Sequence, residues 1–262
     1  MSCLAEQAKI LRAEAEENNL GIKARNASWR RWSECSLCEQ KYHGVVACAL
    51  GWACWKTHLG RPETDQARLG AMTALGNGLT TVGRHEEALP VKEAQLATLR
   101  RLGANEQNIL LVQTNLSNTY AIIGKSEQAV EMDRDVYSGR VKLNGEEDET
   151  TLRAANNYAW GLCKVRHCEE AKALMRKVIP VTRRILGADN HLTLSMRWVY
   201  AKALCDDTGA TLGDLREAVT TLEDTARTAR RVLGGAHPTT TAIEDNLHMA
   251  RATLRASETG NA

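Results

Sequence analysis

Several kinds of residue and segment are scarce or missing in this chain of 262 residues, and each absence excludes something. Phenylalanine does not occur, so Trp, Tyr, Leu and Met must supply the bulky groups of the core. No apolar run approaches the roughly 18 residues that a membrane span needs. The 34 basic and 32 acidic residues nearly cancel, and a net charge of +2 favours neither a nucleic-acid nor a membrane partner.

Motifs for catalysis and for export are missing as well. The chain has no Gly-rich phosphate loop, no Ser/His/Asp set and no paired-carboxylate motif, so we expect a protein that is not an enzyme. The segment from Met1 to Gln7 is charged almost at once and lacks the apolar core of a signal peptide. This argues for the cytosol or the nucleus, and we expect a cytoplasmic protein whose cysteines remain thiols or bind metal.

One pattern recurs along the chain at a step of about 42 residues. Each copy has a Leu or Tyr at the centre of one apolar-striped segment, followed by an Ala in the next. The pairs are Leu75/Ala88, Leu116/Ala129, Tyr158/Ala171 and Tyr200/Ala218. The first three are 13 residues apart and the fourth 18, because about five extra residues lie between Cys205 and Leu215. Self-similarity at a fixed period is typical of a solenoid, whose units bury their apolar faces only by stacking.

Helix stop signals divide each copy into a first and a second helix. The second helix of the second repeat is predicted from Ser126 to about Leu143, and that of the third is predicted to close at Leu186-Gly187. A fifth first helix is predicted around Leu247, and the chain after it is too short for a complete second helix, as expected of a terminal cap. The sequence therefore predicts an all-α protein, a right-handed α-solenoid of about four and a half helix-turn-helix repeats.

The repeats resemble tetratricopeptide repeats of the longer kinesin-light-chain type. The resemblance rests on segments such as 83–90 (GRHEEALP), 100–103 (RRLG), 156–158 (NNY) and 230–238 (RRVLGGAHP), and it covers about residues 65–256. It implies a protein-interaction scaffold with a peptide or partner segment bound along a concave surface lined by the first helices. We therefore expect a Cys-rich N-terminal segment at 1–60, a repeat array at 61–256 and a disordered tail at 257–262.

The helical period predicts which residues would face such a groove. If the landmark Leu or Tyr is buried, the residues two before and two after it lie on the free face of the first helix. Amides can bond both edges of a peptide backbone, and Trp offers a flat apolar anchor. For both tryptophans, packing between neighbouring repeats is the equally weighted alternative. The predicted groove residues are Thr73, Asn77, Thr114, Asn118, Asn156, Trp160, Trp198 and Lys202.

Five of the eight cysteines lie in the first 54 residues. Cys35 and Cys38 form a Cys-x2-Cys pair whose thiolates could hold one Zn²⁺. Cys54 and His58 are four residues apart and would share a helix face. In one interpretation the pair closes a site with local residues; in another these thiols are ordinary buried side chains. The further candidate ligands are Cys3, His43, Cys48, Cys54 and His58.

The N-terminal segment also resembles the C-terminal half of a RING-CH zinc finger. Cys3, a predicted helix at 4–19, Trp29 or Trp32, the Cys35/Cys38 pair and Tyr42 follow the order of that half. The first Cys pair, the central Cys and the His of the finger have no counterpart in the chain. The resemblance implies an alternative function as the substrate-recruiting part of a RING-CH ubiquitin ligase. A third interpretation is a stabilising spacer without a ligand.

The end of the Cys-rich segment is apolar. Residues 47–53, together with Trp52 and Trp55, predict a short helix that docks on the first repeat. Such a helix would make the segment an N-terminal cap even without a metal ion.

Overall fold

The computed structural model describes residues 2–260, which form twelve helices and no strand. The chain divides into two compact units, Met1–Lys125 and Ser126–Ala262. The helices of the first unit are α1 (Ser2–Glu17), α2 (Ile22–Arg30), α3 (Gly44–His58), α4 (Gln66–Thr81), α5 (His85–Arg101) and α6 (Glu106–Ile122). Those of the second unit are α7 (Ser126–Asn144), α8 (Glu149–Lys164), α9 (Cys168–Leu186), α10 (His191–Asp206), α11 (Leu212–Leu233) and α12 (Pro238–Gly260).

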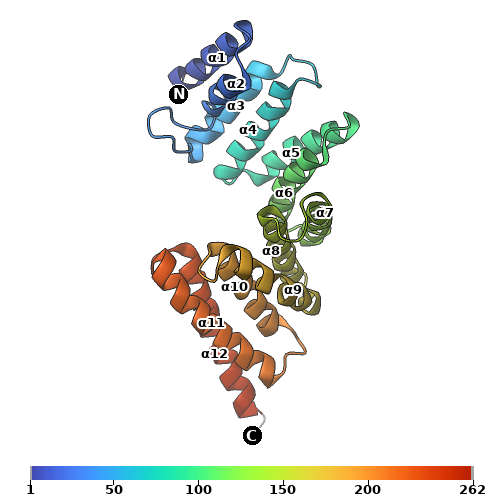
Figure 1. Ribbon diagram of the computed structural model, residues 1–262, viewed down its shortest axis with the longest axis vertical. Helices are drawn as coiled ribbons and strands as arrows, with labels where there is room; N and C mark the ends of the chain where they lie inside the picture. Colours follow the sequence, from blue (N-terminus) through green and yellow to red (C-terminus); the bar gives the residue numbers. More distant parts are fainter. Residues whose placement is uncertain (1, 261–262) are drawn as a thin grey trace. The chain divides into compact units, whose positions relative to one another are not determined.

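From α3 to α6 and from α7 to α12, consecutive helices of each unit pack as neighbours, while α1 packs on both α2 and α3 (Figure 1). The predicted first helices correspond to α4, α6, α8, α10 and α12, and the second helices to α5, α7, α9 and α11. The second helix of the third repeat, α9, ends at Leu186 as predicted. The second helix of the second repeat, α7, begins at the predicted Ser126. All the landmark Leu, Tyr and Ala residues of the four pairs are buried, with at most 8% of any residue exposed.

Asx residues fix where four of the five first helices, α4, α6, α8 and α10, begin. The Asp65 carboxylate accepts a hydrogen bond from the Ala67 amide at 2.6 Å, and the Asn190 side chain accepts from the Leu192 amide at 2.8 Å. Asn105 and Asp148 cap α6 and α8 in the same way. Such caps satisfy backbone donors that have no partner within the helix. The start of each of these four helices is therefore fixed by contacts between residues close in sequence.

The core of the second unit is one continuous cluster. It contains residues of α8, α9, α10, α11 and α12, among them Leu162, Met175, Leu194 and Leu222, which are each at most 1% exposed. Tyr158 and Tyr200 belong to this cluster, and their hydroxyl groups bond carboxylates of the following second helices. The core thus joins successive hairpins, as the solenoid prediction requires.

In the first unit, α3 packs closely on α4 because two glycines have no side chains at the contact. A Cβ on Gly51 would lie 2.6 Å from the Ala74 carbonyl oxygen. A Cβ on Gly78 would lie 2.8 Å from the Ala47 carbonyl oxygen. Either substitution would force the two backbones apart.

The apolar helix expected around residues 47–53 with Trp55 is α3, which extends to His58 and packs against α4 of the first repeat as predicted. One expectation about length was wrong. The tail expected to be disordered at 257–262 is helical through Gly260, as part of α12, while residues 261–262 lie outside the described part of the chain. No helix among the described residues is both long enough and apolar enough to span a bilayer.

Candidate functional site

The helices α8 and α10 bring four of the predicted groove residues together. Trp160 on α8 and Trp198 on α10 are in contact, with ring centroids 5.2 Å apart and planes inclined by 52°. Both rings also pack against the core cluster of the second unit, and both are half-buried. The two tryptophans therefore contribute to packing between repeats while part of each residue stays accessible.

Charged groups border this aromatic pair. The Lys202 ammonium lies 5.9 Å from the centre of the Trp160 ring and 2.7 Å from the Asp206 carboxylate. The Lys164 ammonium lies 5.1 Å from the same ring. A cation over an aromatic face is stabilised by the ring quadrupole. One ammonium group from α8 and one from α10 thus lie beside the aromatic pair.

An amide one turn before Trp160 belongs to the same surface. Asn156 on α8 accepts a hydrogen bond at 3.3 Å from the Ser195 hydroxyl on α10, which leaves its amide nitrogen free to donate to a ligand. We call Asn156, Trp160, Lys164, Ser195, Trp198 and Lys202 the α8–α10 surface. Ser195 and Lys164 were missed from the sequence, although their spacing of three or four residues from Trp198 and Trp160 is the usual signal for a shared helix face.

The predicted groove residues of the first unit differ in how accessible their polar groups are. Asn77 on α4 and Asn118 on α6 are exposed. The Thr73 hydroxyl is held between helices, because it accepts a 2.6 Å hydrogen bond from the Gln95 amide on α5. The Thr114 hydroxyl donates to the Leu110 carbonyl of its own helix at 2.8 Å. The two asparagines are therefore accessible to a ligand, whereas both threonine hydroxyls are already bonded within the chain.

Cys54 and His58 lie together inside the N-terminal part of the first unit. Both residues are fully buried, and the Cys54 sulfur is 3.9 Å from His58 Nδ1. His58 Nδ1 is also 2.8 Å from the Cys54 carbonyl oxygen, to which it donates when it carries the proton. Burial lowers the pKa of His58 and raises the pKa of the Cys54 thiol to about 12. Both groups are thus neutral near pH 7.

The indole rings of Trp29 and Trp32 lie beside the His58 imidazole. Their centroids are 5.6 and 6.2 Å from it in edge-on arrangements. Trp32 is only 3% exposed, and the His58 Nε2 atom has no hydrogen-bond partner among the described residues. Aromatic rings border the imidazole, and no group of three ligand side chains lies there among the described residues, which suits a packed histidine better than a metal ligand.

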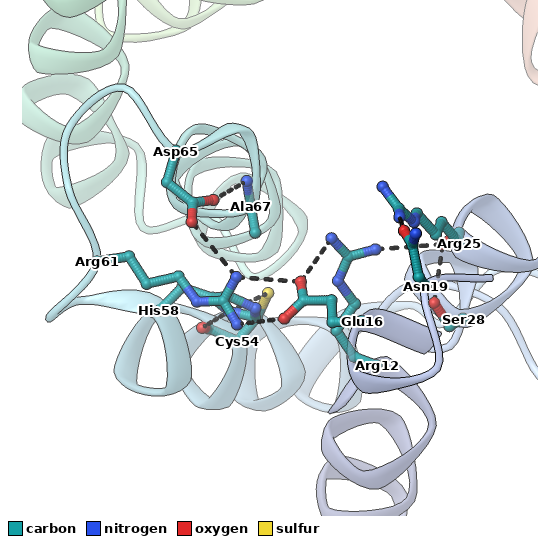
Figure 2. A network of polar contacts seen from close by, with 10 residues as sticks. All are labelled: Arg12, Glu16, Asn19, Arg25, Ser28, Cys54, His58, Arg61, Asp65 and Ala67. Atoms are coloured by element: carbon teal, nitrogen blue, oxygen red, sulfur yellow. Dashed lines mark hydrogen bonds and ion pairs between the residues drawn. The ribbon is translucent and has the colours of Figure 1, made fainter. Parts of the chain in front are cut away.

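An ion-pair network near the Cys54–His58 pair ties α1 to the start of α4 (Figure 2). The Arg61 guanidinium binds both oxygens of Glu16 at 3.0 and 2.7 Å, and it reaches Asp65 at 3.4 Å. Arg12 contacts the same Glu16 carboxylate at 2.7 Å. The hydrogen bond from Arg61 is the main reason that the pKa of Glu16 is lowered. The network therefore fastens the N-terminal helix to the repeat that follows it.

Cys35 and Cys38 lie in a tight turn closed by the pairing of Glu34 with Lys41. Backbone amides of the turn donate to the Cys35 sulfur, and their hydrogen bonds lower the pKa of this thiol. Burial, together with the neighbouring Cys35, raises the pKa of Tyr42. Two thiols with amide donors around one of them suit a metal ligand pair, as the Cys-x2-Cys spacing predicts.

The other candidate ligands do not join this pair. Nowhere in residues 2–260 do three or more His, Cys, Asp or Glu side chains gather in a group that could hold a metal ion. Cys48 and Cys54 are buried in α3, whereas Cys3 is exposed. The structure thus brings together two of the ligands of the predicted Zn²⁺ site but not a complete set. Zinc binding, like the RING-CH resemblance, stays a prediction.

Comparison with known families finds the repeat in one part of the chain. A family model described as "Tetratricopeptide repeat" matches residues 151–192, which cover nearly all of α8, the turn after it and α9. The sequence matches no curated protein. The matched copy is the third of the repeats predicted from the sequence, and it contributes Asn156 and Trp160 to the α8–α10 surface.

Solved structures extend the likeness to most of the chain. Two crystal structures from Podosopora anserina, of nearly identical TPR-like repeats of a putative kinesin light chain, are 18% identical and cover 88% of this chain and 96% of theirs, with TM-scores of 0.60 and 0.58. A Rap protein complexed with competence and sporulation factor is 14% identical, with a TM-score of 0.50, over 80% of this chain and 59% of that chain. At these identities the likeness shows the fold, and the predicted α-solenoid of tetratricopeptide-like repeats is confirmed.

Proposed function

We propose that this protein is a non-enzymatic interaction module that binds a segment of a partner protein on the first helices of its repeats. The observation that carries this proposal is the α8–α10 surface, where an aromatic pair, two lysines and an amide lie on neighbouring first helices. Large aromatic side chains with polar groups around them are the commonest anchors in protein interfaces.

The chemistry of this surface suits an extended peptide. The Asn156 amide can bond a peptide backbone, while the half-buried rings of Trp160 and Trp198 offer an apolar contact. The Lys164 ammonium, which forms no ion pair with a described residue, favours a peptide with a carboxylate near the apolar contact. The Rap protein with a similar fold is complexed with a factor, which supports ligand binding as a use of this architecture.

Affinity capture followed by paired variants tests the proposal. A partner is first identified with the wild-type chain, and its binding is then measured to Asn156→Ala. Loss of the hydrogen bond that this amide gives the peptide predicts binding about fivefold weaker, with unchanged helix content by circular dichroism.

The control variant is Arg153→Ala, which changes an exposed residue on the same helix, α8. It is expected to bind as the wild type does. Equal binding by wild type, test variant and control would contradict the proposed surface.

A further inference from the structure

The first unit contains a second candidate binding site that is separate from the α8–α10 surface. A cavity of about 400 Å³ lies where α3 and α5 flank α4. Trp52 and Trp55 of α3, Met72 and Leu75 of α4, and Val91 of α5 line it. A cavity of this size accommodates two or three apolar side chains, and it falls within the range of ligand sites in proteins.

The rim of this cavity is open to solvent. Trp52 is 37% exposed, which is high for so large an apolar side chain, and Pro90 and Ala94 of α5 are exposed as well. An exposed apolar hollow bordered by polar groups is a feature of interaction sites. The ligand would therefore enter from the side of α5 and α3 and cover Trp52.

One uncompensated positive charge lies at this cavity. The Arg68 guanidinium is 6.0 Å from the centre of the Trp55 ring and donates one hydrogen bond, at 2.7 Å, to the Arg61 carbonyl oxygen. It forms no ion pair with a carboxylate of the described chain. Glu63, the acidic residue of the lining, is already paired with Arg101. The cavity therefore complements a ligand with an apolar body and a negative charge.

The second unit shows that this apolar lining does not follow from the fold alone. A cavity of about 380 Å³ lies among α7, α8 and α9, where two second helices flank a first helix. Its lining includes Glu127, Glu131, Arg134 and Glu170. Similar helix arrangements thus yield a polar cavity in one unit and an apolar one in the other, because the side chains differ.

We propose that the cavity between α3, α4 and α5 binds a segment of a partner protein in which one or two large apolar side chains lie next to an Asp or Glu. The apolar side chains would pack on Trp52, Trp55 and Met72, and the carboxylate would pair with Arg68. This site is independent of the α8–α10 surface, so the protein could bind a second partner segment here.

A displayed library of random peptides of about 12 residues, selected against the wild-type chain, tests this site. Counter-selection uses Ala94→Glu, which places a bulky acid at the rim, and the matched control is Ala97→Glu on an exposed position of the same helix. We expect selected peptides with a large apolar residue beside an Asp or Glu. Their affinity should fall about tenfold or more for Ala94→Glu and stay unchanged for Ala97→Glu.

Charge and location are then tested with a synthetic copy of a selected peptide. Replacing its acid by the amide should weaken binding to the wild type but not to Arg68→Gln. Trp160→Ala should leave binding unchanged, which separates this site from the α8–α10 surface. The proposal would be overturned by peptides that bind Ala94→Glu as tightly as the wild type or that lack an acidic residue. It would also be overturned if Trp160→Ala abolished binding, or if the selection yielded no binder.

Discussion

The Tyr200 hydroxyl donates a hydrogen bond to the Glu217 carboxylate at 2.7 Å, which links a first helix to the second helix of the same repeat. Tyr158 and Glu170 form the same link one repeat earlier. In both cases the tyrosine is the landmark residue, and the glutamate directly precedes the buried Ala of the pair. The landmark thus does more than fill the core: its polar end fixes the second helix against the first.

Replacing this hydroxyl tests its contribution to stability. Tyr200→Phe is expected to lower the free energy of unfolding by about 1 kcal/mol, because the Glu217 carboxylate loses a hydrogen-bond donor. Tyr137→Phe is the matched control, since no described residue forms a hydrogen bond with that hydroxyl. Urea denaturation of Tyr200→Phe, Glu217→Gln and the double variant should give a coupling energy of similar size. Additive losses would contradict the link.

Lys92 gives the first unit an unusual dependence on alkaline pH. The residue is 4% exposed and donates to the hydroxyls of Thr80 and Thr119 at 2.9 and 2.8 Å, and it forms no ion pair with a described residue. Burial lowers its pKa from 10.5 to about 8. Between these values the unfolded chain binds more protons than the folded chain, so stability should rise with pH, by up to about 3 kcal/mol for this group.

The measurement compares wild type with Lys92→Met between pH 7.5 and 9.5. Buried cysteines act in the opposite direction, because burial raises the pKa of Cys54 and Cys163 to about 12. Both chains share that effect, so the difference between them isolates the lysine. The wild type should gain stability relative to Lys92→Met as the pH rises. Parallel curves for the two chains would refute the lowered pKa of this lysine.

His58 should make the N-terminal helices sensitive to mild acid. Its folded pKa is lowered, chiefly by burial, so below the ordinary value of about 6.5 the unfolded chain binds more protons. The contribution of His58 to the free energy of unfolding is therefore complete above a pH of about 6.5 and declines as the pH falls below it. The charged groups that act on the imidazole are Arg61, Glu16 and Arg12, and their network stays ionised in this window because the pKa of Glu16 is lowered.

Tryptophan fluorescence during denaturation at pH 7.5 and 5.5 measures this effect, since Trp29 and Trp32 contact the imidazole. His58→Leu removes the titrating group while keeping an apolar side chain of similar size. The variant should lose most of the difference in midpoint between the two pH values. An undiminished difference would assign the acid sensitivity to other groups.

Arg166 has a backbone conformation that costs stability. Its φ of 64° occurs where the two preceding repeats have glycine, Gly83 at 75° and Gly124 at 82°. The left-handed region costs a residue with a side chain about 1 kcal/mol. Arg166→Gly should therefore be more stable than Arg166→Ala by about that amount. Both variants lack the hydrogen bond from Arg166 to the Asp206 carbonyl, so thermal unfolding of the pair measures the backbone alone. Equal stabilities would show that the turn is not strained.

The repeats could be predicted because their signals are local. Landmark residues such as Leu116 and Ala129 recur at a fixed step, and Asx residues or glycines limit most of the repeat helices. The residues on the accessible faces of α8 and α10 could be predicted from the helical period, once Tyr158 and Tyr200 were assumed to be buried. Thr73 shows the limit of this reasoning, because its hydroxyl is occupied by Gln95, which comes from another helix 22 residues away.

The amino-acid sequence by itself determined the class of fold, the order of the helices and the register of the repeats, because periodicity and capping act over a few neighbouring residues. Only the tertiary structure decided which side chains meet across longer distances. Arg61 reaches Glu16 across 45 residues, Lys92 bonds residues of two other helices, and Trp52 lines an apolar cavity with α5. These arrangements depend on how helices pack, and burial then sets their charge and their accessibility to a partner.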